Sequence, residues 1–105
     1  MAQFDVYRNP NPASRTRIPF LLDVQTDLLD SLETRVVVPL CRPDALKGKL
    51  ADRLNPVLVV EGRKLAMLTP QLAGVSGKLF GVPVVNLAAE RNAIIAALDL
   101  LITGI

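Results

Sequence analysis

The sequence contains no histidine, no tryptophan and a single cysteine, Cys41. Without histidine the chain lacks the commonest general base, and with it the Ser-His-Asp triad, the Cys-His pair and most zinc sites. One cysteine excludes a disulfide within the chain and a zinc site built from cysteines. We expect Cys41 to be a buried, inert thiol, with a reactive thiol as the alternative. Carboxylate, lysine or arginine chemistry stays open, but the composition favours a binding protein without metal or cofactor over an enzyme.

Long apolar runs and blocks of like charge are also absent. No stretch reaches the roughly 18 apolar residues of a membrane-spanning helix, and the opening MAQFDVYRN lacks the apolar core of a signal peptide. We therefore expect a cytoplasmic protein without a membrane partner. Twelve basic and ten acidic residues leave a net charge of +2. Proteins that bind nucleic acid directly usually carry a basic stripe, and this net charge is too small to indicate one. The glycines are scattered and form no phosphate-binding motif.

Apolar residues are what the chain has in abundance, at 50% of its 105 residues and a mean hydropathy of +0.37. The length predicts one domain over residues 1–105. A domain of this size has much surface for its volume. We therefore expect part of its apolar area to lie in an interface between two copies of the chain.

Short strand patterns occupy much of the sequence. Residues 3–7 alternate apolar and polar, which is typical of a half-buried strand. Residues 18–25 form a second apolar segment, and Pro19 confines it to an edge strand, a strand start or a bulge. Residues 35–40 are β-branched and continuous, which predicts a buried central strand with Pro39 marking its end.

The clearest hairpin joins residues 56–60 to residues 64–68 across Glu61-Gly62-Arg63, because two apolar runs flank a short turn that contains glycine. Residues 79–80 and 82–85 predict a further short strand pair.

Two stretches between the strands are predicted to be irregular. Residues 8–17 are typical of an exposed, mobile loop, and its three arginines are expected to be solvated, with a flexible contact to an acidic partner as the alternative. Residues 42–53 begin near Pro43 and predict a short helical turn, which Gly48 weakens. Its leucines recur at four-residue spacing, at Leu46, Leu50 and Leu54.

One confident helix is predicted, from Leu87 to about Ile102, with Asn86 as its N-cap and Gly104 at its end. We expect its aliphatic side to pack on the core, through Leu87, Ile94, Ile95, Leu98, Leu101, Ile102 and Ile105. A narrow polar ridge lies well away from that side, at Asn92, Ala96, Asp99 and Thr103. The predicted fold class is mainly β with one C-terminal α-helix.

The segment DVQTDLLD contains the most unusual local pattern, two adjacent aliphatic residues among acids. We expect at least one of Leu28 and Leu29 to be exposed, as an apolar contact patch rimmed by Asp27 and Asp30. The plainer alternative is one core leucine and one incidental surface leucine. Together with Asp23 these carboxylates could hold a divalent cation, but turn capping is the preferred interpretation because a calcium loop's glycine and bidentate glutamate are missing.

Several segments together resemble the CcdB family, the toxin component of type II toxin–antitoxin modules. The matching segments run in family order from Gln3 to Ile105: QFDVY, DVQTDLLD, RVVVPL, LNPVLVV and ERNAIIAALDLLITGI. The specific part is the acidic double-aliphatic motif combined with a closing Gly-Ile. The resemblance implies a homodimer in which each protomer is an SH3-like barrel of the CcdB/MazF plasmid-toxin type with a C-terminal helix.

The same resemblance implies a function. A toxin of this family binds the GyrA subunit of DNA gyrase and poisons the cleaved DNA complex, and a CcdA-like antitoxin neutralises it. With the antitoxin it represses its own promoter, so that it meets DNA only through that complex. No enzymatic activity is implied. The gyrase-contact positions carry over to one set of residues, which we expect to converge on one tip: Gln3, Phe4, Leu28, Leu29, Asp99, Thr103, Gly104 and Ile105.

Two departures from the family leave alternatives open. Thr103 stands where the family has tryptophan, and Asp99 where it has asparagine. A tryptophan hot spot typically contributes about 2 kcal/mol or more to binding, and threonine lacks that stacking area. One alternative is therefore a weakly toxic or non-toxic homologue that keeps dimerisation and antitoxin binding. Another is a MazF-like endoribonuclease, which would need a groove lined by Arg15, Arg17, Thr26 and Ser31.

Overall fold

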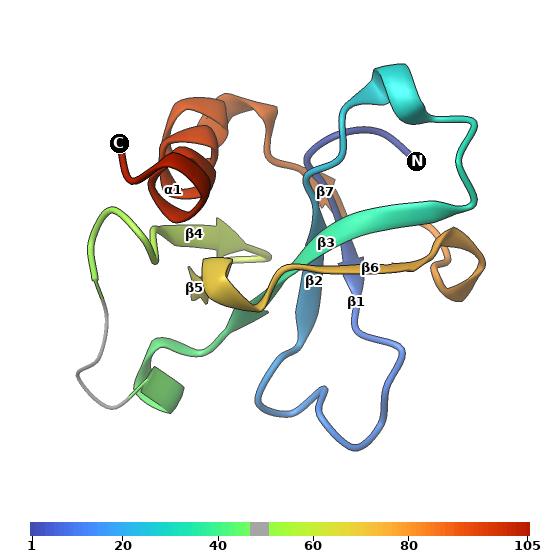
Figure 1. The fold of residues 1–105 in the computed structure, drawn as a ribbon. Helices are drawn as coiled ribbons and strands as arrows, with labels where there is room; N and C mark the ends of the chain where they lie inside the picture. Colours follow the sequence, from blue (N-terminus) through green and yellow to red (C-terminus); the bar gives the residue numbers. More distant parts are fainter. Residues whose placement is uncertain (47–50) are drawn as a thin grey trace.

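Seven β-strands and one α-helix form the regular structure of residues 1–46 and 51–105, the parts of the chain that the computed structural model describes (Figure 1). The strands are β1 (Asp5–Arg8), β2 (Phe20–Asp23), β3 (Thr34–Cys41), β4 (Val57–Val60), β5 (Arg63–Met67), β6 (Ala73–Ser76) and β7 (Val85–Asn86), and the helix is α1 (Arg91–Thr103). Short 3₁₀ turns connect them: η1 (Asp27–Leu29), η2 (Pro43–Leu46), η3 (Thr69–Gln71), η4 (Gly77–Leu79) and η5 (Ala88–Glu90). The predicted class, mainly β with a C-terminal helix, is confirmed.

The strands pair antiparallel in the order β4-β5-β3-β2-β1-β7, and β6 adds to β3. The long strand β3 is the centre, because it pairs with β2 along one edge and with β6 and then β5 along the other. The sheet curls into a nearly closed barrel, and α1 lies over the β4–β5 side (Figure 1). The barrel expected from the sequence is thus confirmed.

Pro39 lies inside β3, so the prediction that it ends the strand is wrong. It faces Leu21 of β2. On the other edge of β3, pairing with β6 stops at Val37 and pairing with β5 starts at Leu40. A proline has no N–H for a ladder, and this one falls where β3 changes neighbours. The other strand proline, Pro19, directly precedes β2, which is the strand-start position.

The β4–β5 hairpin is confirmed, with a turn one residue shorter than predicted. Glu61 and Gly62 alone connect the strands, and Arg63 already belongs to β5. Both turn residues have positive φ, 52° and 76°. Two such residues give the turn the twist that a two-residue hairpin needs.

The second strand pair, predicted within residues 79–85, is wrong. Residues 77–79 form η4, and Val85 pairs instead with Val6 of β1. The sequence also failed to reveal β6, whose AGVS is a weak strand former. The short strands β7 and β6 form because they pair with the free edges of β1 and β3. A local sequence pattern does not indicate such a long-range pairing.

The irregular stretches agree with the sequence in part, because Arg8, the first residue of the predicted loop, belongs to β1 and forms an ion pair with Glu61 at 3.0 Å. The loop between β1 and β2 is exposed at Arg15 and Arg17, and the side chain of Asn9 fixes its base by donating to the Ile18 main-chain oxygen at 2.8 Å. The helical turn predicted over residues 42–53 is present at its start as η2. Its centre, residues 47–50, lies outside the described residues.

The barrel core is mostly aliphatic, with Phe4 and Phe20 inside it, and it includes only part of the predicted inner face of the helix. Ile94 and Ala97 are fully buried against the sheet, and Leu87 joins the same cluster. Cys41 is buried, as predicted. Ile102 and Ile105 were expected to pack as well, but they are 72% and 81% exposed. They fall on the last helical turn and beyond it, where no described element covers them.

The helix also begins later than predicted. The predicted N-cap, Asn86, does not cap the helix, because α1 begins at Arg91 with Glu90 as its N-cap. The side-chain oxygen of Asn86 accepts the Ala88 N–H at 2.8 Å at the start of η5, whose own N-cap is Leu87. Gly104 ends the helix as expected, in the left-handed conformation with φ 77°. Among the described residues, no helix has the length and apolarity to cross a membrane.

Candidate functional site

Both leucines of the acidic segment lie on the surface, which confirms the prediction that at least one is exposed. Leu28 is 91% and Leu29 46% exposed. They belong to η1, in the loop between β2 and β3 (Figure 1). The Thr26 hydroxyl caps this turn by accepting the Leu28 N–H at 3.3 Å. The turn therefore presents its apolar side chains outward from a fixed backbone.

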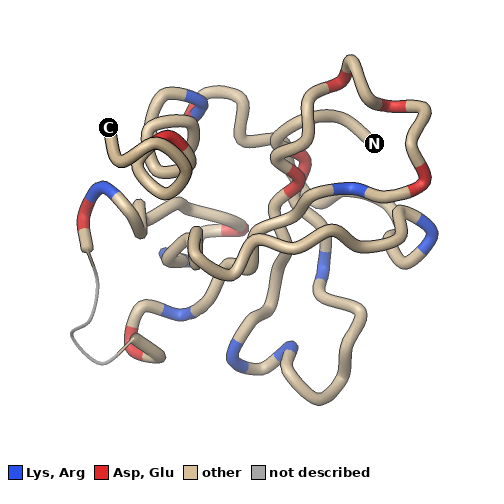
Figure 2. The backbone as a smooth tube through the Cα atoms, in the orientation of Figure 1, with Lys and Arg blue, Asp and Glu red and all other residues tan. Residues whose placement is uncertain are grey.

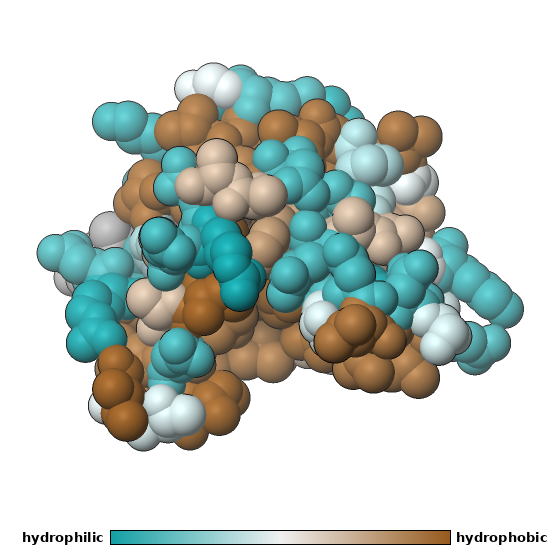
Figure 3. Space-filling model, turned by 90° about the horizontal axis from the view of Figure 1, so that it is seen from above, coloured by the Kyte–Doolittle hydropathy of each residue, from teal (hydrophilic) through white to brown (hydrophobic). Residues whose placement is uncertain are grey.

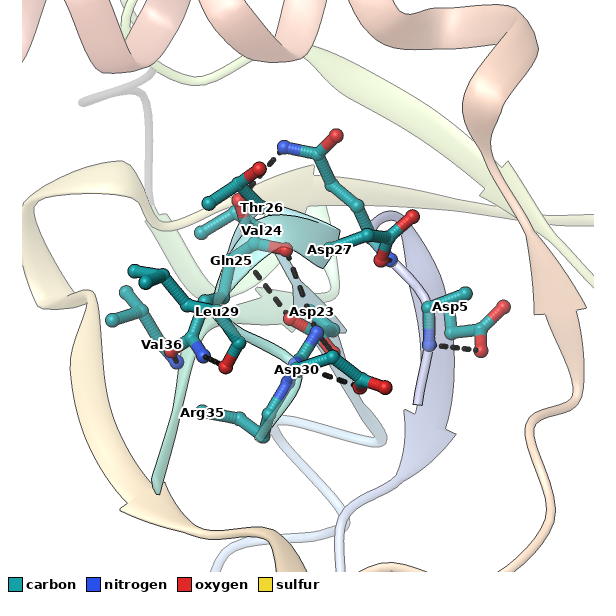
Figure 4. A network of polar contacts seen from close by, with 12 residues as sticks. Asp5, Asp23, Val24, Gln25, Thr26, Asp27, Leu29, Asp30, Arg35 and Val36 are labelled. Carbon is teal, nitrogen blue, oxygen red and sulfur yellow. Dashed lines mark hydrogen bonds and ion pairs between the residues drawn. The ribbon is translucent and has the colours of Figure 1, made fainter. Parts of the chain in front are cut away.

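A buried ion pair supports η1 from below (Figure 4). Arg35 of β3 is 2% exposed, and its guanidinium lies 2.7 Å from the carboxylate of the fully buried Asp23. The same guanidinium reaches Asp30, just after η1, at 3.5 Å. Burial raises the pKa of the Asp23 carboxyl, while the hydrogen bonds from Arg35 and from the Gln25 main chain oppose that rise.

The Gln25 side chain makes a second link between η1 and the barrel. Its Nε2 donates to the Leu29 main-chain oxygen at 3.1 Å, and its Oε1 accepts the Val36 N–H at 3.1 Å (Figure 4). Gln25 is itself buried. The position of η1 is therefore set by β3, although the two are separate in sequence.

The three carboxylates of the acidic segment do not converge on a common point. Asp23 and Asp30 face Arg35, whereas Asp27 accepts the Gln3 N–H at 2.8 Å. Within the described part of the chain, no group of three such side chains is placed to hold a metal ion. Asp23 accepts the Gln25 N–H at 3.0 Å as a turn-capping residue does, Asp23 and Asp30 form ion pairs with Arg35, and Asp27 holds the N-terminal segment.

Of the two N-terminal site residues, one lies beside η1 and the other faces inward. Gln3 also donates from its side chain to the Val24 main-chain oxygen at 3.2 Å, which holds it against the loop. Phe4 is buried in the core with φ 72°, and the Arg91 guanidinium lies 5.8 Å from its ring centre. The ring of Phe4 therefore supports this surface from beneath and does not form part of it.

The other expected site residues gather where α1 ends. Thr103 is exposed, and its hydroxyl donates to the Asp99 main-chain oxygen at 2.7 Å and accepts the Ile105 N–H at 3.3 Å. The Gly104 N–H closes the last turn by donating to the Leu100 oxygen at 3.1 Å. Residues 102–105 thus end the helix in a tight bend, and we call these four residues the C-terminal hook.

A side chain from elsewhere also reaches the hook. Arg53 donates from its guanidinium to the main-chain oxygen of Ile105 at 2.6 Å. The Ile105 side chain points to solvent, as does that of Ile102 at the start of the hook. The hook therefore combines an ordered main chain with two uncovered aliphatic side chains.

The η1 leucines and the hook do not share one surface patch within a protomer, so their expected convergence is not met in a single chain. The hook ends on the side of β4, and η1 lies across the molecule near the N-terminus (Figure 1). The view from above shows apolar groups at several separate places on this face, interleaved with hydrophilic residues (Figure 3). The separation arises because α1 ends on the side of the edge strand β4, whereas η1 connects β2 and β3 in the middle of the sheet.

The residues named for an endoribonuclease groove are also dispersed. Arg15 and Arg17 lie in the β1–β2 loop at the bottom of Figure 1, whereas Thr26 and Ser31 flank η1 at the top. Figure 2 shows the same division of charge, with basic residues along the lower loop and acidic residues around η1. These four residues therefore line no common groove.

A pocket of about 270 Å³ lies next to η1. Asp30 and Glu33 contribute negative charge to its lining, and Arg35 and Lys78 contribute positive charge. The lining of the pocket therefore carries charges of both signs.

A comparison with protein-family models matches residues 3–104 to the CcdB family, described as CcdB protein. The chain belongs to the CcdB family. The nearly closed barrel with one C-terminal helix agrees with the fold of that family. Membership places the protein, in general terms, among the gyrase-poison toxins of toxin–antitoxin modules.

Three supporting residues of this CcdB-family protomer were not predicted from the sequence. Asp23 stands out there only as one of several acids, and Arg35 only as the start of a strand. Arg53 carries no signal, because its partner is 52 residues away. The one clue is the position of Arg35 within a strand predicted to be buried, since a buried arginine needs a carboxylate partner.

Proposed function

We propose that this CcdB-family protein is a homodimeric toxin that binds the GyrA subunit of DNA gyrase and poisons the cleaved DNA complex. The observation that carries the proposal is the C-terminal hook, an ordered bend that exposes aliphatic side chains. The contact surface comprises Leu28, Leu29, Asp99, Thr103, Gly104 and Ile105, with Gln3 beside η1 and Phe4 beneath it. An exposed apolar centre on a rigid scaffold is the anatomy of a protein-binding hot spot.

A dimer fits the separation of the two contact groups. In one protomer η1 and the hook lie on different sides of the molecule. In a dimer the second copy adds another η1 and another hook, so that the same partner can contact several of these groups at once. Two linked contacts raise the effective affinity without new chemistry. Val57 and Val59 on the edge strand β4 are exposed and provide apolar surface for pairing of copies. Light scattering at micromolar concentration tests this step, and a monomer would contradict it.

The remaining parts of the proposal concern regulation. A CcdA-like antitoxin neutralises the toxin in the cytoplasm, and the complex of the two represses their promoter. The toxin itself contacts DNA only through that complex. It acts by binding and carries no catalytic site of its own, which agrees with a sequence that lacks histidine.

The decisive experiment mixes the purified dimer with gyrase, DNA and ATP and measures the trapped cleaved-DNA complex. We expect trapping by the wild type and at least tenfold weaker trapping by Ile105→Ala, because the variant removes the apolar contact surface. Val82→Ala is the matched control, since Val82 is 86% exposed on the segment before β7. Absence of cleaved complex, together with normal growth of cells that express the chain without antitoxin, would rule out the proposal.

The geometry of Thr103 favours a second candidate, a weakly toxic homologue that keeps dimerisation and antitoxin binding. The hydroxyl of Thr103 already makes hydrogen bonds to the Asp99 oxygen and the Ile105 N–H. Threonine also has no aromatic ring that could stack on a partner. Thr103→Trp separates the candidates. An inert wild type with a variant that gains about thirtyfold in gyrase affinity supports the second candidate. A wild type that already poisons gyrase excludes it.

A further inference from the structure

We infer that Arg53 is a positioning residue for the gyrase-binding hook, because its guanidinium fixes the main chain of Ile105 and so the direction of the Ile105 side chain. The inference rests on the proposed function, since it explains how the hook becomes a rigid contact. Arg53 lies outside the set of contact positions carried over from the family.

The hook needs support from outside the helix. Its own bonds fix the chain only as far as the amide of Ile105, through Thr103 and Gly104. Beyond that amide the residue is free to rotate, and an uncovered chain end normally frays. Among the described residues, Arg53 makes the one hydrogen bond that reaches the hook from another element, at 2.6 Å. A charged donor makes this bond stronger than a neutral one.

Arg53 can act as a strut because its neighbours are anchored in the barrel. Asn55 is buried, and its side-chain amide donates to the Met67 main-chain oxygen at the end of β5 at 2.9 Å. The side-chain oxygen of Asn55 accepts the Ala51 N–H at 3.2 Å, and its main-chain N–H donates to the Ala51 oxygen at 2.7 Å. These bonds close residues 51–55 into a tight turn that carries Arg53.

A second anchor lies on the other side of the arginine. The main-chain oxygen of Leu54 accepts the hydroxyl of Thr69 at 2.5 Å. Thr69 is fully buried and begins η3, which packs against α1. The turn that carries Arg53 and the helix that carries the hook are therefore held by the same part of the barrel.

This arrangement lowers the cost of binding. A flexible end would lose its conformational freedom when a partner seats Ile105, whereas a hook that is already fixed loses little. The isoleucine side chain is 81% exposed, so the support restrains the main chain without covering the contact. The partner that suits it is a protein surface with a small apolar pocket.

The test compares Arg53→Ala and Arg53→Lys with the control Lys64→Ala, which removes an exposed positive charge from β5. The first measurement needs no gyrase: the ¹³Cα heteronuclear NOE of Ile105 in the intact dimer, which reports the part of the residue beyond its amide. We expect Arg53→Ala to lower it to the value of a frayed end, Arg53→Lys to lower it less, and Lys64→Ala to leave it unchanged. The melting temperature should stay the same in all three.

The second measurement is affinity for the GyrA subunit of gyrase. Loss of one charged hydrogen bond predicts about tenfold weaker binding by Arg53→Ala. In the Ile105→Ala background the same change should cost less than about twofold, because a positioning residue acts only through what it positions. Additive losses would show that Arg53 contacts the partner itself and would overturn the inference.

The inference and the proposed function fail in different ways. If the NOE of Ile105 is unaffected by Arg53→Ala, or if it falls without a loss of affinity, the inference is wrong while gyrase binding stands. If the wild type does not bind gyrase, the proposed function is wrong, and the NOE alone decides whether Arg53 orders the hook.

Discussion

The turn η1 and the C-terminal hook expose aliphatic side chains to similar degrees, but they are supported in opposite ways. Beneath η1 a buried ion pair, Asp23–Arg35, joins the loop to the centre of the sheet. The hook stands on local hydrogen bonds of the Thr103 hydroxyl and the Gly104 N–H, and on one exposed arginine. Failure of the first support therefore damages the whole barrel, and failure of the second damages only the contact. The side chains of the two sites are similarly exposed, but loss of the support beneath η1 lowers the stability of the barrel, whereas loss of the support of the hook does not.

The largest effect should come from breaking the buried pair. Arg35→Met keeps most of the side-chain length but leaves the Asp23 carboxylate buried without its partner, which typically costs about 3–5 kcal/mol. Urea unfolding followed by far-ultraviolet circular dichroism measures the loss. The double variant Asp23→Asn, Arg35→Met should recover at least half of it. A single variant that loses less than about 1 kcal/mol would refute the distinction between the two supports.

An alkaline titration tests the same buried region without a mutation. Tyr7 is the one tyrosine of a chain without tryptophan, so tyrosinate absorbance reports it alone. Burial, and then the charge of Asp5, raise its pKa from 10.0 to about 12. Because the folded-state pKa is the higher one, this contribution to stability is complete below pH 10 and is lost as the pH rises through 12. The shift corresponds to roughly 3 kcal/mol at most.

The same titration distinguishes the buried support of η1 from the exposed support of the hook. Arg35 lowers the pKa of Tyr7, so Arg35→Met should raise it further, whereas Arg53→Ala should leave it unchanged. A tyrosinate signal that develops with an ordinary midpoint near about 10 in the folded protein would contradict the buried position of the ring.

A smaller and strictly local effect is expected at Gly104. Its φ of 77° is costly for any residue with a Cβ, and Gly104→Ala should cost about 1 kcal/mol within the hook. Hydrogen exchange of the Ile105 amide should accelerate about fivefold, with the melting temperature unchanged. Gly81→Ala is the control, since a Cβ there meets nothing within 4 Å and no left-handed φ is involved. Equal exchange in the two variants would show that the hook does not depend on this bend.

The smallest effect belongs to Thr103. Thr103→Val removes the hydroxyl that accepts the Ile105 N–H, and we expect a local loss of about 0.5 kcal/mol. The exchange rate of the Ile105 amide should rise about twofold, while Thr103→Ser should behave as the wild type. A change in the urea midpoint of Thr103→Val would show that hook and barrel unfold together.

Sequence patterns correctly predicted the features that depend on residues close together in the chain, such as the hairpin turn and the end of the helix. Gly62 marked the hairpin and Gly104 the helix end, because each supplies the positive φ that its turn requires. Leu28 and Leu29 were recognised because adjacent aliphatic residues rarely both face inward. The exposure of Ile102 and Ile105 was not predicted. Helical periodicity indicates on which side of the helix a residue lies, but not how far the sheet extends beneath that side.

Features with distant causes remained hidden. The β1–β7 pairing and β6 depend on edges presented by other strands, and Pro39 is tolerated because of where two neighbours meet. The partners of Arg35 and Arg53 lie 12 and 52 residues away. Both supports of the candidate site are of this kind, so the sequence indicated the contact residues but not what holds them.

The pairing of β1 with β7 has a consequence for how the protein is made. Asn86 bonds to Asp5, 81 positions earlier in the chain, and β7 is the second neighbour of β1. During translation the first strand therefore keeps an open edge until almost the entire polypeptide has emerged, and open edges invite pairing with other nascent chains. A ribosome that stops before β7 therefore releases a chain whose first strand still has an unpaired edge.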